Sequence, residues 1–277
     1  MSEAFEELSL RLPDGYQAYA RFWPAAQPRG AVLFHHGIQS HCGWFTASAQ
    51  KLTEARHCVL QPERRGCGRN MQDRGHADSA EQLIIDAHAA RDELLRRSGF
   101  DQCHVIGVSW GGKLAAAAYV DDPQGIAGLT LVTPGLFPKV GVSREQMAAI
   151  GFSMLYEPRK LHDIPLDDPE FFTADEKWQN FVATDELTLR QCTAGFFLAS
   201  RRMDKTVDKL VRSAPIPLHL MLAGDERIID NEKTIEFSNQ LSWPQVRITT
   251  FDRARHSLEF DCADEYLSRL VPSLSKP

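Results

Sequence analysis

The amino-acid sequence predicts an α/β protein in which helices cover both faces of a mostly parallel, eight-stranded sheet. Three observations lead to this prediction. Short apolar runs alternate with helical patterns along most of the 277 residues, as in chains that build parallel sheets through helical crossovers. A serine flanked by glycines joins one apolar run to an alanine-rich stretch. The alternation stops near residue 136 and resumes after residue 208, which indicates an insertion.

The first third of the chain carries four predicted strands. They are short apolar runs bounded by turn residues: Phe5–Leu12, Tyr16–Trp23, Ala31–His35 and Cys58–Leu60. Pro13-Asp14-Gly15 separates the first two, which we expect to form an antiparallel hairpin because proline presets φ and glycine takes the left-handed turn position. Helices are expected within Cys42–Arg56 and over Ala80–Ser98. Ser79 is the expected N-cap of the second helix, with Gln82 as its capping-box partner.

The strand Cys103–Val108 leads through a sharp turn into the next predicted helix. The turn is Gly107-Val108-Ser109-Trp110-Gly111, and its glycines lack the Cβ atoms that would keep strand and helix apart. Ser109 is therefore expected to stand at the strand tip with its hydroxyl facing a substrate. The N–H of Trp110, in the first helical turn, can stabilise a developing oxyanion.

The last third of the chain resumes the alternation. Strands are predicted at Ala127–Thr133, Leu218–Ala223 and Val246–Phe251, and helices at Glu232–Leu241 and at the C-terminal end up to about Leu270. Parallel strands place their carboxyl ends at one edge of a sheet. Catalytic groups are therefore expected at that edge, where His36, Ser109 and the loop with Arg64 fall.

Residues 136–208 show no strand pattern but carry several prolines and many aromatic residues. Helical segments are predicted around Ser143–Leu155 and Asp185–Arg202. We interpret this region as a helical cap, or lid, inserted into one core domain that comprises residues 1–135 and 209–277.

Composition narrows the classes of partner. The chain is 43% hydrophobic and has a formal net charge of −6, which argues against nucleic acid as a main partner because that role needs a basic surface. Arg64, Arg65, Arg69 and Arg74 lie close together, but the acidic neighbours Glu63 and Asp73 dilute their charge. A solvated, salt-bridged loop is the preferred interpretation of this arginine cluster.

Six cysteines are scattered without Cys-x-x-Cys spacing: Cys42, Cys58, Cys67, Cys103, Cys192 and Cys262. This distribution predicts free thiols in a reducing compartment. The acidic start of the chain lacks the features of a secretory signal, and no apolar run reaches transmembrane length. A cytoplasmic location is expected.

A serine hydroxyl needs a base to accept its proton and an acid to orient that base. Of the ten histidines, His256 alone lies between the last predicted strand and the closing helix. Three carboxylates follow the preceding strand and could supply the acid: Asp225, Glu226 and Asp230. Adjacent His35 and His36 point in different directions and have no further ligand nearby in sequence, so neither a metal nor another cofactor is expected.

Four sequence segments together resemble the α/β-hydrolase fold family, and in particular its monoacylglycerol-lipase and lysophospholipase-like branch. The segments are His36-Gly37, Arg65-Gly66-Cys67-Gly68-Arg69, Gly107-Val108-Ser109-Trp110-Gly111 and His256-Ser257. The resemblance covers nearly the whole chain outside the proposed lid. It implies a nucleophilic Ser109 and an oxyanion hole formed by the amides of Trp110 and Ile38.

The resemblance also bears on the triad acid. The family's acid is usually an aspartate one position before a short run of the form x-Ile/Val-Ile/Val-Asp/Pro, here Arg227-Ile228-Ile229-Asp230. This register implies Glu226, a departure from aspartate, with Asp225 as the second choice. Asp230 fits an N-cap of the following helix better.

The combined prediction is a serine hydrolase that cleaves carboxylic esters, such as monoacylglycerols or lysophospholipids, with a small acyl ester as its partner. A thioesterase, an acyltransferase or a carbon–carbon hydrolase would use the same triad. A protein that keeps the fold and binds a ligand without catalysis is the alternative from another class. The sequence leaves a homodimeric state open.

Overall fold

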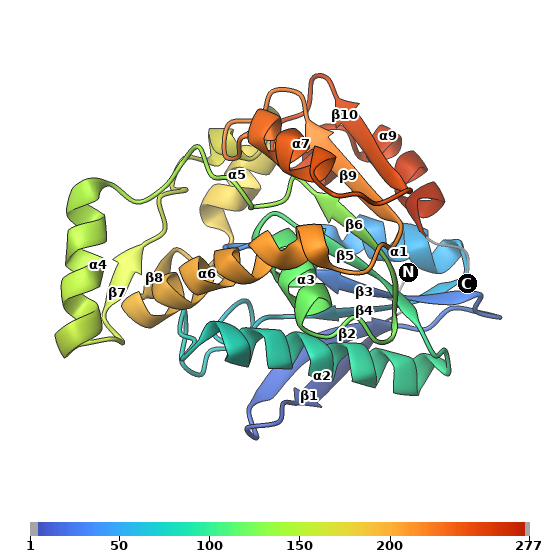
Figure 1. Ribbon diagram of the computed structural model, residues 1–277, viewed down its shortest axis with the longest axis horizontal. Helices are drawn as coiled ribbons and strands as arrows, with labels where there is room; N and C mark the ends of the chain where they lie inside the picture. Colours follow the sequence, from blue (N-terminus) through green and yellow to red (C-terminus); the bar gives the residue numbers. More distant parts are fainter. Residues whose placement is uncertain (1–4, 275–277) are drawn as a thin grey trace.

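The computed structural model describes residues 5–274, and eight strands form its central sheet (Figure 1). The spatial order is β1-β2-β4-β3-β5-β6-β9-β10. The strands are β1 (Glu6–Arg11), β2 (Gln17–Trp23), β3 (Gly30–His35), β4 (His57–Pro62), β5 (Cys103–Val108), β6 (Ile126–Val132), β9 (Leu218–Ala223) and β10 (Val246–Phe251). Strand β2 runs antiparallel to β1 and β4, and all other neighbours are parallel. This confirms the predicted sheet.

The central strands read as uninterrupted apolar runs because both of their faces are covered. Every residue of β3, β4, β5 and β9 is buried. Helices α2 (Ala80–Ser98) and α3 (Trp110–Asp121) lie side by side against one face. Helices α1 (Thr46–Glu54) and α9 (Ala263–Leu270) pack together on the other face (Figure 1). Such double coverage is typical of parallel sheets.

Two predicted N-caps are confirmed. The Ser79 hydroxyl accepts the Gln82 N–H at 3.1 Å at the start of α2, and Gly99 ends this helix in the left-handed conformation. The Gln82 side chain accepts from the N–H of Asp78 rather than from that of Ser79. Asp230 caps α7 (Asn231–Asn239) by accepting the Lys233 N–H.

Two helices that were predicted as continuous are divided. A short 3₁₀ helix, η1 (Cys42–Phe45), precedes α1. The closing helix is interrupted at Cys262, whose ψ of 46° is not helical. Helix α8 (Leu258–Asp261) precedes this residue, and α9 and then η4 (Val271–Ser273) follow it.

The expectation that no strand lies between β6 and β9 is wrong. Two three-residue strands, β7 (Leu161–Asp163) and β8 (Gln191–Thr193), pair antiparallel. Strands this short cannot display an alternating pattern that sequence reasoning could detect. The segment also contains η2 (Pro169–Phe171) and η3 (Asp208–Arg212).

The helices of the same segment agree with the prediction in part. Helix α4 (Arg144–Tyr156) lies where one was predicted. Helix α6 (Ala194–Val207) begins nine residues after the predicted Asp185, because the Thr193 hydroxyl accepts the Phe196 N–H and caps it there. Helix α5 (Glu176–Thr184) was not predicted. Figure 1 shows α4, β7 and β8 projecting beyond the end of the sheet, with α6 lying across α3.

All six cysteines are free thiols, as predicted. Within residues 5–274, no helix combines the length and the apolar character needed to span a bilayer.

Candidate active site

The turn between β5 and α3 holds Ser109 in an unusual backbone conformation. Its φ of 54° and ψ of −122° lie outside the regions that non-glycine residues prefer. A Cβ at Gly107 would lie 2.4 Å from the carbonyl oxygen of Gly111, and one at Gly111 would lie 2.5 Å from that of His35. The turn therefore requires glycine at both positions, which is the physical basis of the Gly-x-Ser-x-Gly pattern.

Hydrogen bonds to backbone carbonyls bring the loops of Ser109 and His256 to the same strand end. The Ser109 N–H donates to the carbonyl of Val132 at 2.9 Å. The next residue, Thr133, donates its hydroxyl to the carbonyl of His256 at 3.0 Å. Both loops are therefore anchored at the carboxyl end of β6, as the strand-end argument predicts.

His256 and Glu226 form a buried pair beside this edge. Nδ1 of His256 lies 3.0 Å from both carboxylate oxygens of Glu226, and the residues are only 2% and 7% exposed. An imidazole whose Nδ1–H donates to a carboxylate carries its lone pair on Nε2. That Nε2 atom is buried and has no hydrogen-bond partner among residues 5–274, so it is ready to accept a proton from a nearby donor.

The environment of Glu226 favours its ionised form. Burial alone would raise the pKa of this carboxyl, but the charge of His256 and the hydrogen bond from its ring lower it. The amides of Ile228 and Ile229 also donate to Oε1, at 2.8 and 3.3 Å. The net result is a pKa below the usual glutamate value, so Glu226 is a carboxylate at neutral pH.

The other two acidic candidates lie elsewhere. Asp225 is about half exposed and pairs with Arg227 at 3.2 Å and with Arg255 at 3.4 Å. Asp230 is occupied as the cap of α7. Neither carboxylate forms a hydrogen bond or ion pair with His256 among the described residues.

The amides of Ile38 and Trp110 are the sequence-predicted oxyanion donors. Both residues line the same cavity as Ser109. Within the described chain neither N–H has a hydrogen-bond acceptor, although a donor without an acceptor is uncommon in proteins. Two free N–H groups beside a serine hydroxyl could bind a substrate oxygen.

Arg64 contradicts the expectation of a solvated arginine loop. It is 9% exposed and Arg65 is 8% exposed. Arg65 does form salt bridges, to Asp86 at 2.5 Å and Asp14 at 2.9 Å. Arg64 instead donates to the carbonyls of Gly37 and Ile38, and its guanidinium lies 4.6 Å from the ring centroid of Trp110. Arg64 and Arg65 are adjacent in sequence but are buried in two different environments, which the composition of the segment does not reveal.

His36 is fixed in its neutral form between these loops. The Arg64 N–H donates to its Nε2 at 3.0 Å, so Nδ1 carries the proton and donates to the carbonyl of Gly37 at 2.8 Å. Burial and then the nearby Arg64 charge hold the pKa of His36 well below the usual histidine range. Both ring nitrogens are engaged by the protein, which leaves neither lone pair for a metal.

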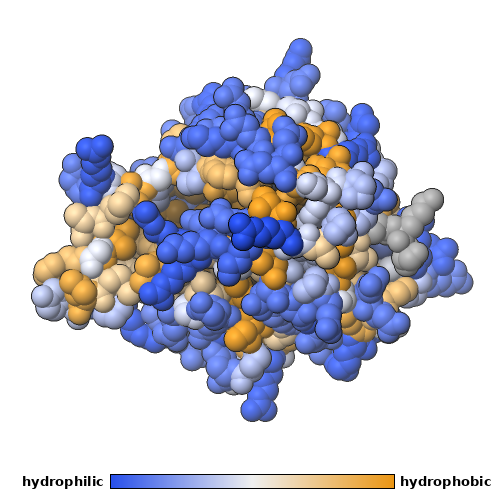
Figure 2. Space-filling model, in the orientation of Figure 1, coloured by the Kyte–Doolittle hydropathy of each residue, from blue (hydrophilic) through white to orange (hydrophobic). Residues whose placement is uncertain are grey.

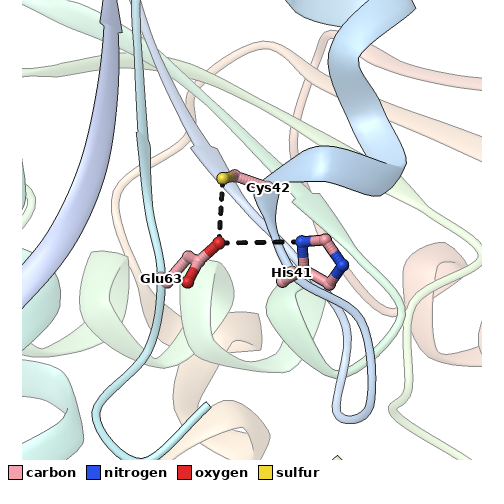
Figure 3. A group of neighbouring side chains, drawn as sticks. All are labelled: His41, Cys42 and Glu63. Atoms are coloured by element: carbon pink, nitrogen blue, oxygen red, sulfur yellow. Dashed lines mark hydrogen bonds and ion pairs between the residues drawn. The ribbon is translucent and has the colours of Figure 1, made fainter. Parts of the chain in front are cut away.

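His41, Cys42 and Glu63 form a second cluster of potential metal ligands (Figure 3). Their contacts already satisfy them: Cys42 Sγ donates to Glu63 at 3.0 Å, and His41 Nδ1 accepts the Gly43 N–H at 3.1 Å. Burial, followed by the charge of Glu63, raises the pKa of the Cys42 thiol, which disfavours the thiolate that binds metals. The cluster ties the loop after β3 to the loop after β4.

A cavity of about 650 Å³ opens beside Ser109. Helices α4 and α6 and the loop after β6 provide most of its apolar lining: Pro138, Val140, Val142, Met147, Ile150, Met154, Phe197 and Leu198. Four charged residues also line it, namely Lys113, Arg201, Asp204 and Lys205. The shape and lining suit an apolar chain that carries a polar group.

Sequence reasoning missed the charged part of this cavity. Lys113 follows Ser109 by four positions, which is about one helical turn, and this spacing could have placed it beside the nucleophile. Arg201 and Lys205 had no such signal, because the position of α6 over α3 is a tertiary feature. Phe172 is one of the aromatic residues expected in the lid, but its contact with His256 was not predicted; the two rings lie 6.2 Å apart, edge to face.

Comparisons with known proteins show the family and the fold of the chain. A family model described as Serine aminopeptidase, S33, matches residues 26–263. The uncharacterized protein YnbC of Escherichia coli is 24% identical over 284 residues, which cover 95% of this chain and 47% of YnbC. The proline iminopeptidase of Lactobacillus helveticus is 26% identical over 183 residues, covering 62% of this chain and 59% of that protein. The chain thus spans less than two thirds of these curated relatives.

Solved structures share the fold over nearly the whole chain. The crystal structure of a monoacylglycerol lipase from Paleococcus ferrophilus has a TM-score of 0.81 at 19% identity, and the match covers 92% of this chain and 99% of that one. At this level of identity the similarity establishes a common fold.

Proposed function

Because the chain belongs to the serine aminopeptidase S33 family of α/β-hydrolases, we propose that it is a serine hydrolase that cleaves carboxylic esters through an acyl-enzyme on Ser109. The observation that carries the proposal is the buried Glu226–His256 pair, whose free Nε2 lies in a loop anchored beside that of Ser109. A serine, an imidazole and a carboxylate in this order provide a nucleophile, its base and the acid that orients the base.

The proposed reaction has two steps. His256 Nε2 accepts the hydroxyl proton of Ser109 as Oγ attacks the ester carbonyl, and the imidazolium then gives that proton to the leaving alcohol. Water attacks the acyl-enzyme in the second step, with His256 again accepting and returning one proton. Glu226 stays ionised throughout and stabilises the imidazolium.

The amides of Ile38 and Trp110 are the proposed oxyanion hole. Their N–H groups have no acceptor within residues 5–274 and border the cavity that contains Ser109. Negative charge that develops on the substrate oxygen would meet two donors already in place, which is where such stabilisation is largest.

Residues 136–208 are proposed to act as the lid of this site. The segment supplies Phe172 against His256 and most of the apolar cavity wall. Apolar side chains over a catalytic imidazole exclude water and strengthen the electrostatic interactions below them. An apolar acyl chain fits the wall that α4 and α6 provide.

The charges of the cavity favour esters over aminopeptidase substrates. An aminopeptidase binds a cationic N-terminal amine, which calls for a free carboxylate. Asp204 is the one acidic residue in the described lining, and Lys113 already pairs with it at 2.5 Å. Arg201 and Lys205 add positive charge that would repel an ammonium group.

A substrate panel tests the proposal. We expect hydrolysis of p-nitrophenyl esters of increasing chain length, loss of this activity in Ser109→Ala, and little turnover of proline p-nitroanilide. Matched thioesters test for a thioesterase, and added acceptor alcohols test for an acyltransferase. Compounds with a hydrolysable carbon–carbon bond test for a carbon–carbon hydrolase. Esters left untouched while the anilide is cleaved would contradict the proposal, and ligand binding without any turnover would favour the non-catalytic alternative.

The proposal also covers the cellular compartment, the partner and the oligomeric state of the protein. The six free cysteines suit a reducing compartment such as the cytoplasm. A small acyl ester is the proposed partner, and sedimentation can decide between a monomer and a homodimer.

A further inference from the structure

We infer that Arg201 and Lys205 form a subsite for an anionic group on the substrate, so that the preferred ester carries a phosphate or carboxylate in addition to its apolar chain. This inference rests on the proposed function of Ser109 and names the chemical class of its substrate. The carrying observation is the presence of two cations without acidic partners in the wall of the cavity that contains the nucleophile.

The two cations share one face of a helix. Arg201 and Lys205 are four residues apart on α6, so their side chains project in the same direction. Both are exposed. Within residues 5–274 neither forms an ion pair with a carboxylate, and the polar contact of Arg201 is to the sulfur of Met147 at 4.0 Å. Their charges are therefore free to interact with a ligand.

The acidic residue between them does not neutralise this charge. Asp204 pairs with the amine of Lys113, a residue only 6% exposed, at 2.5 Å. The opposite charges of Lys113 and Asp204 cancel, so the positive charges of Arg201 and Lys205 remain in the cavity lining. The whole chain has a net charge of −6, so the excess is local and opposite in sign to the rest of the molecule. Clefts lined by one sign of charge concentrate ligands of the other sign.

The subsite lies within reach of an ester bound at Ser109. Lys113 follows Ser109 by about one turn of α3, roughly 6 Å along the helix axis, and contacts Asp204, which directly precedes Lys205. Trp110, which follows the nucleophile, donates its indole N–H to Ser200, which directly precedes Arg201, at 2.9 Å. An anion separated from the scissile carbonyl by a short spacer, such as glycerol, could therefore reach this part of the cavity.

The surface around the cavity has a hydrophobic part over α4 and a hydrophilic part over α6. In Figure 2, hydrophobic side chains gather over α4 at the left of the view, and hydrophilic side chains cover α6 beside them. Met147, Ile150 and Met154 of α4 line the cavity together with the charged residues of α6, and Met147 contacts Arg201. This arrangement suits an amphiphile whose chain lies against α4 while its anionic group lies at α6. Arg201 can bind a phosphate or carboxylate through two N–H groups.

Matched substrate pairs test the inference. We propose measuring kcat/KM for a 1-acylglycerol and for its 3-phosphate with the same acyl chain, at low salt and below the concentrations at which they aggregate. The phosphate ester is expected to be the better substrate by tenfold or more, with an advantage that shrinks as salt is added. A second pair, a hemiester of a dicarboxylic acid and an uncharged ester of equal length, tells whether the anion belongs on the alcohol or the acyl side.

The Arg201→Gln/Lys205→Gln double variant should bring the ratio between charged and uncharged substrates close to one. Arg202→Gln is the matched control, because Arg202 is an exposed cation of the same helix that does not line the cavity, and it should keep the wild-type ratio. Equal turnover of both members of each pair by the wild type, or a ratio that survives the double substitution, would overturn the inference.

A binding measurement separates failure of this inference from failure of the proposed function. Decyl phosphate should bind Ser109→Ala at least tenfold more tightly than decanol, and the two α6 substitutions should remove the difference. This result without any esterase activity in the wild type would contradict the proposed hydrolysis and retain the subsite. Equal binding of both compounds would contradict the subsite whatever the enzyme cleaves.

Discussion

The guanidinium group of Arg64 donates a hydrogen bond of 2.7 Å to the backbone carbonyl of Ile38. Another of its nitrogens donates to the carbonyl of Gly37 at 3.2 Å, and this carbonyl shares a peptide unit with the Ile38 N–H. The C=O and N–H of a trans peptide point in opposite directions. Arg64 therefore fixes the orientation of the N–H that we propose as an oxyanion donor.

Replacing Arg64 should impair the chemical step more than binding. We expect Arg64→Met to lower kcat by about 10- to 100-fold with little change in KM, since loss of an oxyanion donor costs about 100- to 1,000-fold and this change only misorients one. Arg64→Lys should recover part of the loss. Arg69→Gln is the control, because its side chain contacts Glu63 and the Tyr19 ring rather than the carbonyls. A KM effect alone would argue against this role.

Two neighbouring carboxylates should respond differently to neutralisation. Glu226→Gln is expected to lower kcat by orders of magnitude, since the amide cannot stabilise the imidazolium form of His256. Asp225→Asn should stay within about twofold, because the Asp225 carboxylate is about half exposed and its ion pairs with Arg227 and Arg255 do not involve His256. Steady-state kinetics with a p-nitrophenyl ester measures kcat for both variants and so identifies the triad acid. Urea unfolding checks that both variants are folded. The reverse pattern would move the acid to Asp225.

Much of the framework was predictable because it rests on local rules. Hydrophobic periodicity located all eight strands of the central sheet, and the steric need for glycine located the turn at Ser109. The interpretation of Asp230 as a helix cap is also confirmed. In each case a short stretch of sequence contains the whole physical cause.

The features that escaped prediction depend on contacts between distant segments. Arg64 looked like a solvated loop residue, yet the loop after β3 buries it. Strands β7 and β8 pair across a separation of about thirty residues and are too short for a pattern. Arg201 and Lys205 reach the cavity only because α6 lies over α3.

Two glycines should show opposite effects when replaced by alanine. Gly107→Ala would place a methyl group 2.4 Å from the Gly111 oxygen, so we expect a loss of about 3 kcal/mol in stability and a displaced Ser109 with strongly reduced kcat. Gly151 lies inside α4 with no atom within 4 Å of an added Cβ. Gly151→Ala should stabilise the protein by about 0.5–1 kcal/mol. Thermal unfolding that ranks the two variants the other way would contradict this packing account.

Glu259 should make stability depend on pH. Its carboxyl is buried against the N-terminus of α1, where it accepts from the amides of Ala47 and Ser48. Burial is the dominant influence and raises its pKa from 4.5 to about 7. A folded-state pKa above the unfolded one means that the protonated form stabilises the fold, and that this contribution is lost as pH rises from about 4.5 through 7.

The variant Glu259→Gln cannot titrate and isolates this contribution. Relative to the wild type, its free energy of unfolding should increase between pH 5 and pH 8.5 by an amount on the order of 3 kcal/mol. Urea unfolding at both pH values measures the difference. A constant difference between the two proteins would show that Glu259 has the same pKa in the folded and unfolded states.

The central claim is that Ser109 is a nucleophile activated by His256, and covalent labelling tests it most directly. The folded protein would be treated with a fluorophosphonate probe, and the modified residue identified by mass spectrometry of its peptides. We predict a single phosphonylated residue, Ser109, no labelling of Ser109→Ala, and labelling of His256→Ala slowed by orders of magnitude. An unlabelled Ser109 in the folded wild-type protein, or labelling that His256→Ala leaves equally fast, would contradict the account.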